Sequence, residues 1–312
     1  MGEFKMKRPT MKDIAEKAGV STATVSYVLN YSEKQTISHE MRLKIFQIAK
    51  ELNYVPNMNA KSLAKASVQN RTLGFVYEKK LLESAASKYV FSLFFSQLQQ
   101  ELSAKGIEVI PLQVNNFIED VQLIHDKYFD FLLVLNFNEE TSEKFTSNFY
   151  IPILFFGGNV AFEIFRRLKI DYEAIFTAFL KDTQTEEQLL VIDSSVDKGV
   201  VSQAQALFKE GHVMDSSEDY FQYIKEKNIK AVLVLNEITA LQLEREFAET
   251  QLTLYSLIHD SEQKLLRDST KKILIDNKEV IKNIQDTMVF FTDWKSNIWE
   301  HNKKVIVPVF LS

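Results

Sequence analysis

A short amphipathic segment, a glycine and a second amphipathic segment lie between residues 10 and 30. Thr10 can cap a helix through its hydroxyl, and Asp13, three residues later, favours the positive end of that helix. Gly19 supplies the backbone freedom that a tight turn needs, and Ser21 is a good cap for the next helix. This layout of two short helices around a turn is a helix-turn-helix, which predicts a small all-α head.

The apolar residues of the head follow helical spacing. The expected inner faces are Ile14, Ala15 and Ala18 in the first helix, Val25, Val28 and Leu29 in the second, and Ile45, Ile48, Ala49 and Leu52 in a third helix that follows a Ser38 cap. Thr22, Ala23, Ser26 and Tyr27 then face outward. Their side chains are small or able to form hydrogen bonds, which suits a DNA groove.

Four motifs follow one another over about sixty residues of this segment. They read A-G-V-S-x-x-T-V-S-x-V-L-N from residue 18, I-S-x-E-x-R from 37, E-L-x-Y-x-P-N from 51 and A-K-S-L from 60. In this order they resemble the LacI/GalR family of bacterial repressors. The resemblance implies a regulator that reads a roughly palindromic operator as a homodimer, since two-fold protein symmetry requires two half-sites.

The resemblance also implies roles for residues of the head. Thr22, Ala23 and Tyr27 would read bases. Ser21, Thr24, Asn30 and Tyr54 would contact or buttress phosphates, and Thr10 and Ser26 complete the expected DNA-binding surface. The family commonly has arginine where Tyr27 stands, and the guanidinium is the usual bidentate partner of guanine. The operator sequence of relatives therefore does not transfer to this chain.

Residues 56–71 are predicted to form a hinge helix and linker after the head. Residues 57–66 can form a short helix, but ten residues are too few to stay helical alone. In the family this segment folds when two copies meet in the minor groove, and the leucine that matches Leu63 is wedged between base pairs. Unstacking costs a few kcal/mol, which wrapped surface must offset. The expected DNA contacts here are Asn57, Lys61, Ser62, Leu63 and Ala64. The alternative is a plain solvated linker.

Length and charge favour a chain of two unequal parts. Its 312 residues exceed one typical domain, and 46% hydrophobic residues can build a sizeable core. Residues 1–72 hold 12 Lys and Arg against 6 Asp and Glu, a net charge of +6, so the overall charge of -5 leaves -11 for the remainder. The basic end would approach DNA, and the acidic body would be held away from it.

We expect a helix-turn-helix domain over residues 6–55, the hinge and linker over 56–71 and a core over 72–312. Residues 1–5 match nothing in the family and would be an added remnant, a disordered leader or the product of a late start codon. In the core, short apolar runs alternate with helical segments, which predicts parallel sheets covered on both faces. Strands are expected at 72–77, 107–114, 131–135, 153–156, 189–192, 231–235, 254–258, 272–275 and 305–310.

The family resemblance implies that this core is periplasmic-binding-protein-like. It would consist of two doubly wound α/β lobes with parallel sheets, joined by crossing strands, and an effector would bind between them. Lobe 1 is expected at about 72–170 plus part of the C-terminal region, and lobe 2 at about 171–288.

Candidate effector-binding residues are Asn136, Asp171, Asn236, Glu237 and Asp260, of which Asp171 and Asp260 match family aspartates. Where relatives carry an Asn-Asp pair, this chain has Asn236 and Glu237. Where they carry arginine and, three residues later, glycine, it has Gly199 and Ser202. A sugar cleft needs bidentate partners for hydroxyl pairs, so we expect a standard free-sugar site to be degraded. The alternative is an ordinary ligand pocket, built from residues other than those matched here to the family positions.

Phe91, Phe94 and Phe95 lie in a segment that the resemblance places at the subunit interface of lobe 1. If some of these rings face outward, they form an apolar patch suited to a two-fold dimer. The alternative is internal packing.

Nothing in the sequence favours an enzyme or a cofactor. There is no nucleophile elbow, phosphate-cradling loop or glycine-rich dinucleotide turn. The chain has no cysteine, and its histidines are not spaced like metal ligands. No apolar run reaches membrane-spanning length, and the lack of cysteine suits a reducing cytoplasm. The expected function is repression of a carbohydrate or related metabolic operon. The expected partners are double-stranded operator DNA, a second copy, and an effector (sugar, sugar phosphate or purine) or a partner protein. In the alternative, the core is blind to effectors and serves only dimerisation or docking.

Overall fold

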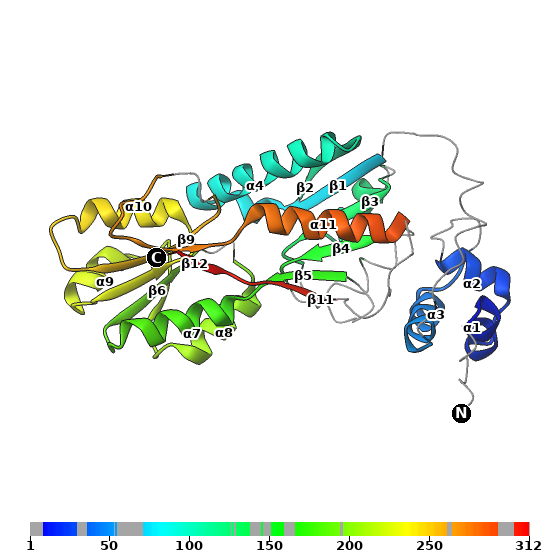
Figure 1. Cartoon of the computed structure of the whole chain (residues 1–312), viewed down its shortest axis with the longest axis horizontal. Coiled ribbons are helices and arrows are strands. Elements are labelled where there is room, and N and C mark those ends of the chain that lie inside the picture. The colour runs from blue at the N-terminus through cyan, green and yellow to red at the C-terminus, as the bar shows by residue number, and fades with distance from the viewer. Residues whose placement is uncertain are drawn as a thin grey trace, which may run out of the picture.

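The computed structural model describes residues 9–29, 36–52, 54, 71–125, 127, 129–137, 145, 151–158, 166–193, 196–260, 264–292 and 303–311. They form a three-helix head and an α/β core of two lobes, as Figure 1 shows. The predicted fold class is confirmed.

The head consists of α1 (Met11–Ala18), α2 (Thr22–Leu29) and α3 (His39–Glu51). A capping box starts α1, because the Thr10 hydroxyl accepts from the Asp13 backbone N–H at 3.3 Å and the Thr10 N–H donates to the Asp13 carboxylate at 2.6 Å. Gly19 ends the helix at φ 75°, in the left-handed region that glycine tolerates. The predicted inner faces are confirmed as buried, except that Leu52 is half-buried.

The sheet of lobe 1 contains six parallel strands in the order β11-β5-β4-β3-β1-β2. The strands are β1 (Arg71–Glu78), β2 (Ile107–Val114), β3 (Phe131–Leu135), β4 (Ile153–Phe156), β5 (Arg166–Ile170) and β11 (Lys303–Ile306). The helices of this lobe are η2 (Lys79–Leu82), α4 (Ala85–Ser103), α5 (Val121–His125) and α11 (Asn277–Thr292). α4 and α11 contact each other along the lobe (Figure 1).

The sheet of lobe 2 has the order β12-β10-β9-β8-β6-β7, and only β12 runs antiparallel to its neighbour. Its strands are β6 (Gln188–Ile192), β7 (Val213–Asp215), β8 (Ala231–Val234), β9 (Thr253–Ile258), β10 (Lys271–Leu274) and β12 (Val309–Leu311). Its helices are α7 (Tyr172–Thr183), α8 (Lys198–Leu207), α9 (Tyr220–Glu226) and α10 (Glu237–Glu246).

Three segments cross between the lobes, after β5, after β10 and after β11. The crossing after β11 shows that one prediction was wrong. The single strand expected at 305–310 is instead two strands, β11 and β12, which belong to different sheets. They are separated by Val307 and Pro308, and proline has no N–H to give to a continuous ladder. Two further strands, β5 and β7, were not predicted.

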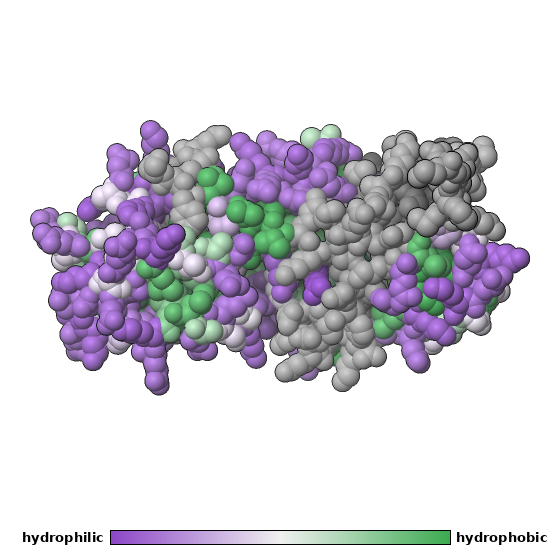
Figure 2. Space-filling model, turned by 60° about the horizontal axis from the view of Figure 1, so that its bottom comes forward, coloured by the Kyte–Doolittle hydropathy of each residue, from purple (hydrophilic) through white to green (hydrophobic). Residues whose placement is uncertain are grey.

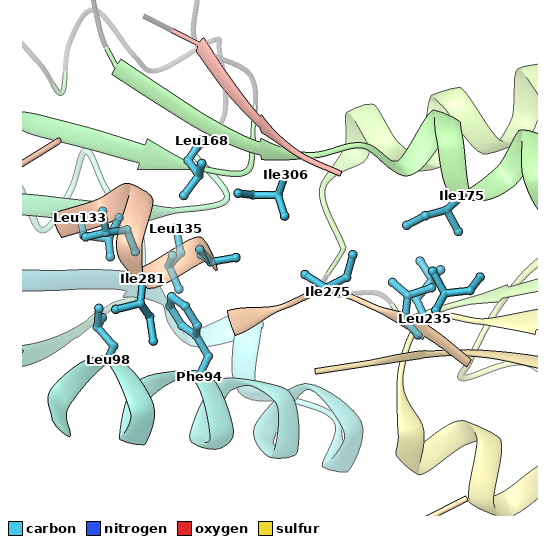
Figure 3. Close-up of a cluster of buried hydrophobic side chains, with 14 of the residues drawn as sticks. Phe94, Leu98, Leu133, Leu135, Leu168, Ile175, Leu235, Ile275, Ile281 and Ile306 are labelled. Atoms are coloured by element: carbon cyan, nitrogen blue, oxygen red, sulfur yellow. The ribbon is translucent and has the colours of Figure 1, made fainter. Parts of the chain in front are cut away.

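Apolar side chains continue from one lobe into the other. In Figure 3, Phe94, Leu98 and Ile281 pack together in lobe 1, while Ile175 and Leu235 lie in lobe 2. Ile275 lies on the crossing segment after β10, Ile306 ends β11 directly before another crossing, and both are almost fully buried. The crossings are thus held by the same core as the sheets. On the face seen in Figure 2, most of the coloured surface is hydrophilic, and apolar residues gather in small groups. Within the described ranges, no helix is both long and apolar enough to cross a membrane.

Candidate functional site

The exposed face of α2 is the first candidate site. Ser21 caps this helix, since its hydroxyl accepts from the Thr24 N–H at 3.0 Å. Thr22 and Ala23, the first two residues of the helix, are exposed, while Ser26 and Tyr27 are half-buried beside them. A helix N-terminus carries partial positive charge and free N–H groups, which suit phosphate oxygens. Of the four residues predicted to face outward, Thr22 and Ala23 are therefore exposed at the start of a capped helix, and the other two are half-buried next to them.

Other predicted DNA-binding residues have structural roles in the head. Thr10 is exposed, but its hydroxyl belongs to the capping box of α1. Tyr54 is only 5% exposed and packs in the head core, and this burial raises the pKa of its hydroxyl. Tyr54 can thus buttress the head more readily than reach a phosphate. Asn30, Asn57, Lys61, Ser62, Leu63 and Ala64 lie outside the described residues.

A cavity of about 410 Å³ between the lobes is the second candidate site. It lies beyond the carboxyl ends of β3, β4, β6 and β8, where open α/β sheets bind ligands. Aromatic walls come from Phe91, Phe94, Phe156 and Tyr172, and polar lining side chains are Ser87, Asn136, Lys169, Asp193, Asp197, Gln203, Asn236, His259 and Asn277. This mixture of apolar walls and a few polar groups is typical of a small-molecule site.

Two of the five predicted effector residues line this cavity, namely Asn136 and Asn236. The Asn236 side chain also caps α10, because its carbonyl oxygen accepts from the Thr239 N–H at 2.7 Å. Asp171 caps α7 instead, accepting from the Ala174 N–H at 3.0 Å. Glu237 and Asp260 are not among the described lining residues.

Gly199 and Ser202, the two positions expected to differ from the family, lie differently relative to the cavity. Gly199 lines it, whereas Ser202 is exposed and donates to the Lys198 carbonyl at 3.0 Å. None of the described lining residues is arginine. Gly157 and Gly158, both at φ 71°, bring backbone into the wall, and a Cβ on Gly158 would lie 2.0 Å from the Phe137 carbonyl oxygen.

Sequence reasoning missed Asp193, Asp197, Lys169 and His259 as lining residues. Asp193 follows directly after β6 and Asp197 directly precedes α8, so the position of both in the segment after a strand end was the available signal. Asp193 is only 5% exposed. Asp197 caps α8 through the Gly199 N–H at 2.6 Å. Burial, followed by the charge of Asp197, raises the pKa of Tyr172 to about 12, so this wall keeps a neutral phenol.

His259 and Glu237 form a buried pair at the edge of the cavity. The Glu237 carboxylate accepts from the His259 backbone N–H at 2.7 Å and lies 3.2 Å from its Nδ1. Burial alone would raise the pKa of Glu237, but the hydrogen bonds and charge of His259 outweigh burial and lower that pKa. The carboxylate predicted to meet an effector is therefore used within the protein.

The three phenylalanines of α4 pack largely inward. Phe94 is 6% exposed, and its ring centroid lies 6.1 Å from Phe75 and 5.6 Å from Phe156. Phe91 and Phe95 are half-buried, stacked on each other at 5.8 Å. Internal packing accounts for Phe94, Phe91 also lines the cavity, and the half-buried Phe95 keeps surface for a partner. In the described part of the chain, no group of three or more His, Asp or Glu side chains could hold a metal ion.

Residues 10–57 match the family model of bacterial regulatory proteins of the lacI family. The sucrose operon repressor of Klebsiella pneumoniae is 36% identical over 108 residues, 34% of this chain and 30% of the relative. The transcriptional repressor PurR of Erwinia tasmaniensis is 33% identical over 130 residues, 40% of this chain and 35% of the relative. The ribose operon repressor of Haemophilus influenzae is 46% identical over 67 residues, 22% of this chain and 19% of the relative. The matches thus span about a third or less of these relatives.

Two solved structures share the fold over almost the whole chain. The lac repressor dimer bound to operator and the anti-inducer ONPF has a TM-score of 0.62 at 18% identity, covering 98% of both chains. The complex of the transcriptional regulator CelR with cellobiose has a TM-score of 0.59 at 15% identity, covering 98% of this chain and 99% of the other. At these identities the likeness concerns the fold. The motifs of the head and its family match lead to one conclusion: residues 10–57 form a helix-turn-helix head of the lacI family of bacterial regulatory proteins, and the chain as a whole shares the fold of the lac repressor.

Proposed function

We propose that this chain is a repressor that binds a roughly palindromic operator as a homodimer. The observation that carries the proposal is the exposed start of α2, where Thr22 and Ala23 stand free on a head whose other face is buried. Relatives are named for sucrose and ribose operons, which supports a carbohydrate or related metabolic operon as the target. The protein would act in the cytoplasm, beside the DNA it reads.

In this proposal, residues 56–71 act as a hinge between the head and the core. Two copies of this segment would meet in the minor groove, where both Leu63 side chains would insert between neighbouring base pairs and unstack them. A homodimer supplies the two wedges, and its two heads occupy two half-sites. Residues 6–55 would read the major groove, and the core from residue 72 would hold the pair together.

The cleft between the lobes would bind the effector. A ligand that prefers one spacing of the two lobes shifts the protein towards that spacing, and this would favour or melt the hinge helices. The cavity of about 410 Å³ and the cellobiose complex of a protein with this fold support a small polar ligand such as a sugar, sugar phosphate or purine. The alternative, an effector-blind core, is favoured only by the missing guanidinium at Gly199.

A thermal-shift panel of sugars, sugar phosphates and purines distinguishes an effector-binding core from an effector-blind one. A compound that raises the melting temperature and also changes operator affinity supports the effector reading. Silence across the whole panel, with intact DNA binding, supports the effector-blind core.

The DNA function itself is tested by gel shift with fragments recovered from a genomic footprint. Ala23→Glu places a carboxylate at the start of α2, where it would face bases and phosphates, and should abolish specific binding. Gln205→Glu makes the same change of charge on an exposed position of α8 and should leave binding unchanged. Equal binding by both variants would remove α2 from the interface.

A further inference from the structure

Glu237 and His259 form a buried carboxylate–imidazole pair. Glu237 is the first residue of α10 and is 3% exposed, and His259 follows β9 and is 9% exposed. One carboxylate oxygen accepts from the His259 backbone N–H, and the other faces Nδ1. Two contacts from a single carboxylate fix both the backbone and the ring of the histidine. His259 lines the cavity, whereas Glu237 stands behind it.

This geometry sets the position of the proton on the imidazole. An ionised carboxylate only accepts hydrogen bonds, so the contact at 3.2 Å requires a proton on Nδ1. In the neutral ring the lone pair then resides on Nε2, at the other end of the ring. Within the described part of the chain, no protein group forms a hydrogen bond with Nε2. A histidine that is nine-tenths buried, tied at one nitrogen and lining a cavity, has an acceptor left for a ligand.

We propose that His259 is a specificity-determining residue of the cleft, and that Glu237 is the residue that positions it. In this proposal, Nε2 accepts a hydrogen bond from a hydroxyl or N–H group of the ligand. The inference rests on the proposed ligand-binding function of the cleft. A ligand that lacks a donor there leaves the buried acceptor unpaired, which should weaken its binding about tenfold to a hundredfold.

The surrounding groups are compatible with this arrangement. Tyr89 of α4 lies near the pair, and burial, followed by the charges of Glu237 and Asp260, raises its pKa to about 12. It therefore stays protonated and adds no negative charge beside the pair. The same cavity is faced by Lys169 from β5, by Asp193 and Asp197 from the segment between β6 and α8, and by Asn277 from α11.

The tautomer can be measured without a ligand. Long-range ¹H–¹⁵N correlation spectra of the ¹⁵N-labelled full chain near pH 8 distinguish the two ring nitrogens, and His259→Gln assigns the signals. We expect a protonated Nδ1 and an unprotonated Nε2. Glu237→Gln should shift this balance, because its amide group replaces one acceptor oxygen with a donor.

Glu244→Gln is the matched control. Glu244 lies on the same helix and also accepts hydrogen bonds from the segment after β9, at the Arg267 N–H and the Thr270 hydroxyl, but it does not line the cavity. It should leave the His259 signals unchanged. A proton found on Nε2, or the same tautomer balance in wild type and Glu237→Gln, would overturn the positioning role.

The ligand part is tested by thermal shift with sucrose, ribose, cellobiose and adenine on wild type and His259→Phe. His259→Phe keeps a ring but removes the acceptor, so any probe that stabilises wild type should lose at least about tenfold in affinity. An unchanged affinity overturns the proposal. Silence of every probe overturns its ligand part, and gel shifts then show separately whether DNA binding stands.

Discussion

At the scale of single residues, Tyr27 determines how far the operator of relatives can be transferred. It is half-buried on the free side of α2, where the family commonly has arginine. Tyr27→Ala should change which bases are preferred and leave nonspecific affinity nearly unchanged, because the side chain carries no charge for phosphates. Selection of random duplexes with wild type and variant checks this. The same enriched motif from both would contradict a base-reading role.

Tyr172 gives a prediction at alkaline pH. Its folded-state pKa of about 12 lies above the ordinary value of 10.0, mainly because of burial and then because of Asp197. The unfolded chain loses this proton at lower pH than the folded chain does. The contribution of the neutral Tyr172 hydroxyl to the free energy of unfolding is therefore complete below about pH 10 and is lost as the pH rises towards 12. Tyr172→Phe should flatten the fall in the free energy of unfolding over that range.

Asp197→Asn is the companion variant, since asparagine can still cap α8 but carries no charge. It should flatten the same fall less than Tyr172→Phe does, because burial is the larger cause. Chemical unfolding at several alkaline pH values measures both. An equal slope in wild type and Tyr172→Phe would contradict the assignment.

At the scale of elements, the turn between α1 and α2 rests on Gly19. Its φ is 75°, and a Cβ there would meet no atom within 4 Å, so only the backbone conformation resists substitution. Gly19→Ala should destabilise the head by about 1–2 kcal/mol, and Gly19→Asn by less, because asparagine visits the left-handed region. Amide hydrogen exchange of α1 and α2 in the full chain measures the loss. Equal protection in all three proteins would show that the turn carries no strain.

The hinge element is tested through Leu63, which lies outside the described residues. Leu63→Ala should weaken specific binding and reduce the bend of the operator while leaving the core intact, because alanine is too short to separate a base step. A circular-permutation gel shift reports the bend. An unchanged bend angle would remove the wedge role.

Sequence signals for elements were strongest where they were local. The caps at Thr10 and Ser21, the Gly19 turn and the apolar spacing predicted the head almost to the residue. β5 was missed because three of its five residues are Arg or Lys, and only Leu168 is fully buried. β7 has only three residues, none of them fully buried.

The cleft could be predicted only in part, because its lining comes from segments far apart in the chain. Asn136 and Asn236 stand at strand ends and were found, as expected for open α/β sheets. Glu237 was expected to meet a ligand, yet it pairs with His259, which lies 22 positions away. A contact between residues so far apart cannot be predicted from the spacing of nearby residues. Asp171 was expected there too, but it caps α7.

At the scale of the whole molecule, charge is divided between the ends of the chain. The net charge of +6 in residues 1–72 faces a core with -11. Because basic residues displace counterions from phosphates, operator affinity should fall by orders of magnitude between about 50 and 200 mM salt, linearly on a double-logarithmic plot. Titrations at several salt concentrations measure the slope. A flat response would contradict an interface built on phosphate contacts.

The most direct test of the account is selection of duplexes from a random library by the purified full chain, with and without candidate effectors. Paired heads predict enrichment of one motif with two inverted half-sites, separated by an easily kinked central step. A motif with a single half-site would contradict the homodimer. No enrichment over random competitor, under any condition, would contradict sequence-specific DNA binding itself.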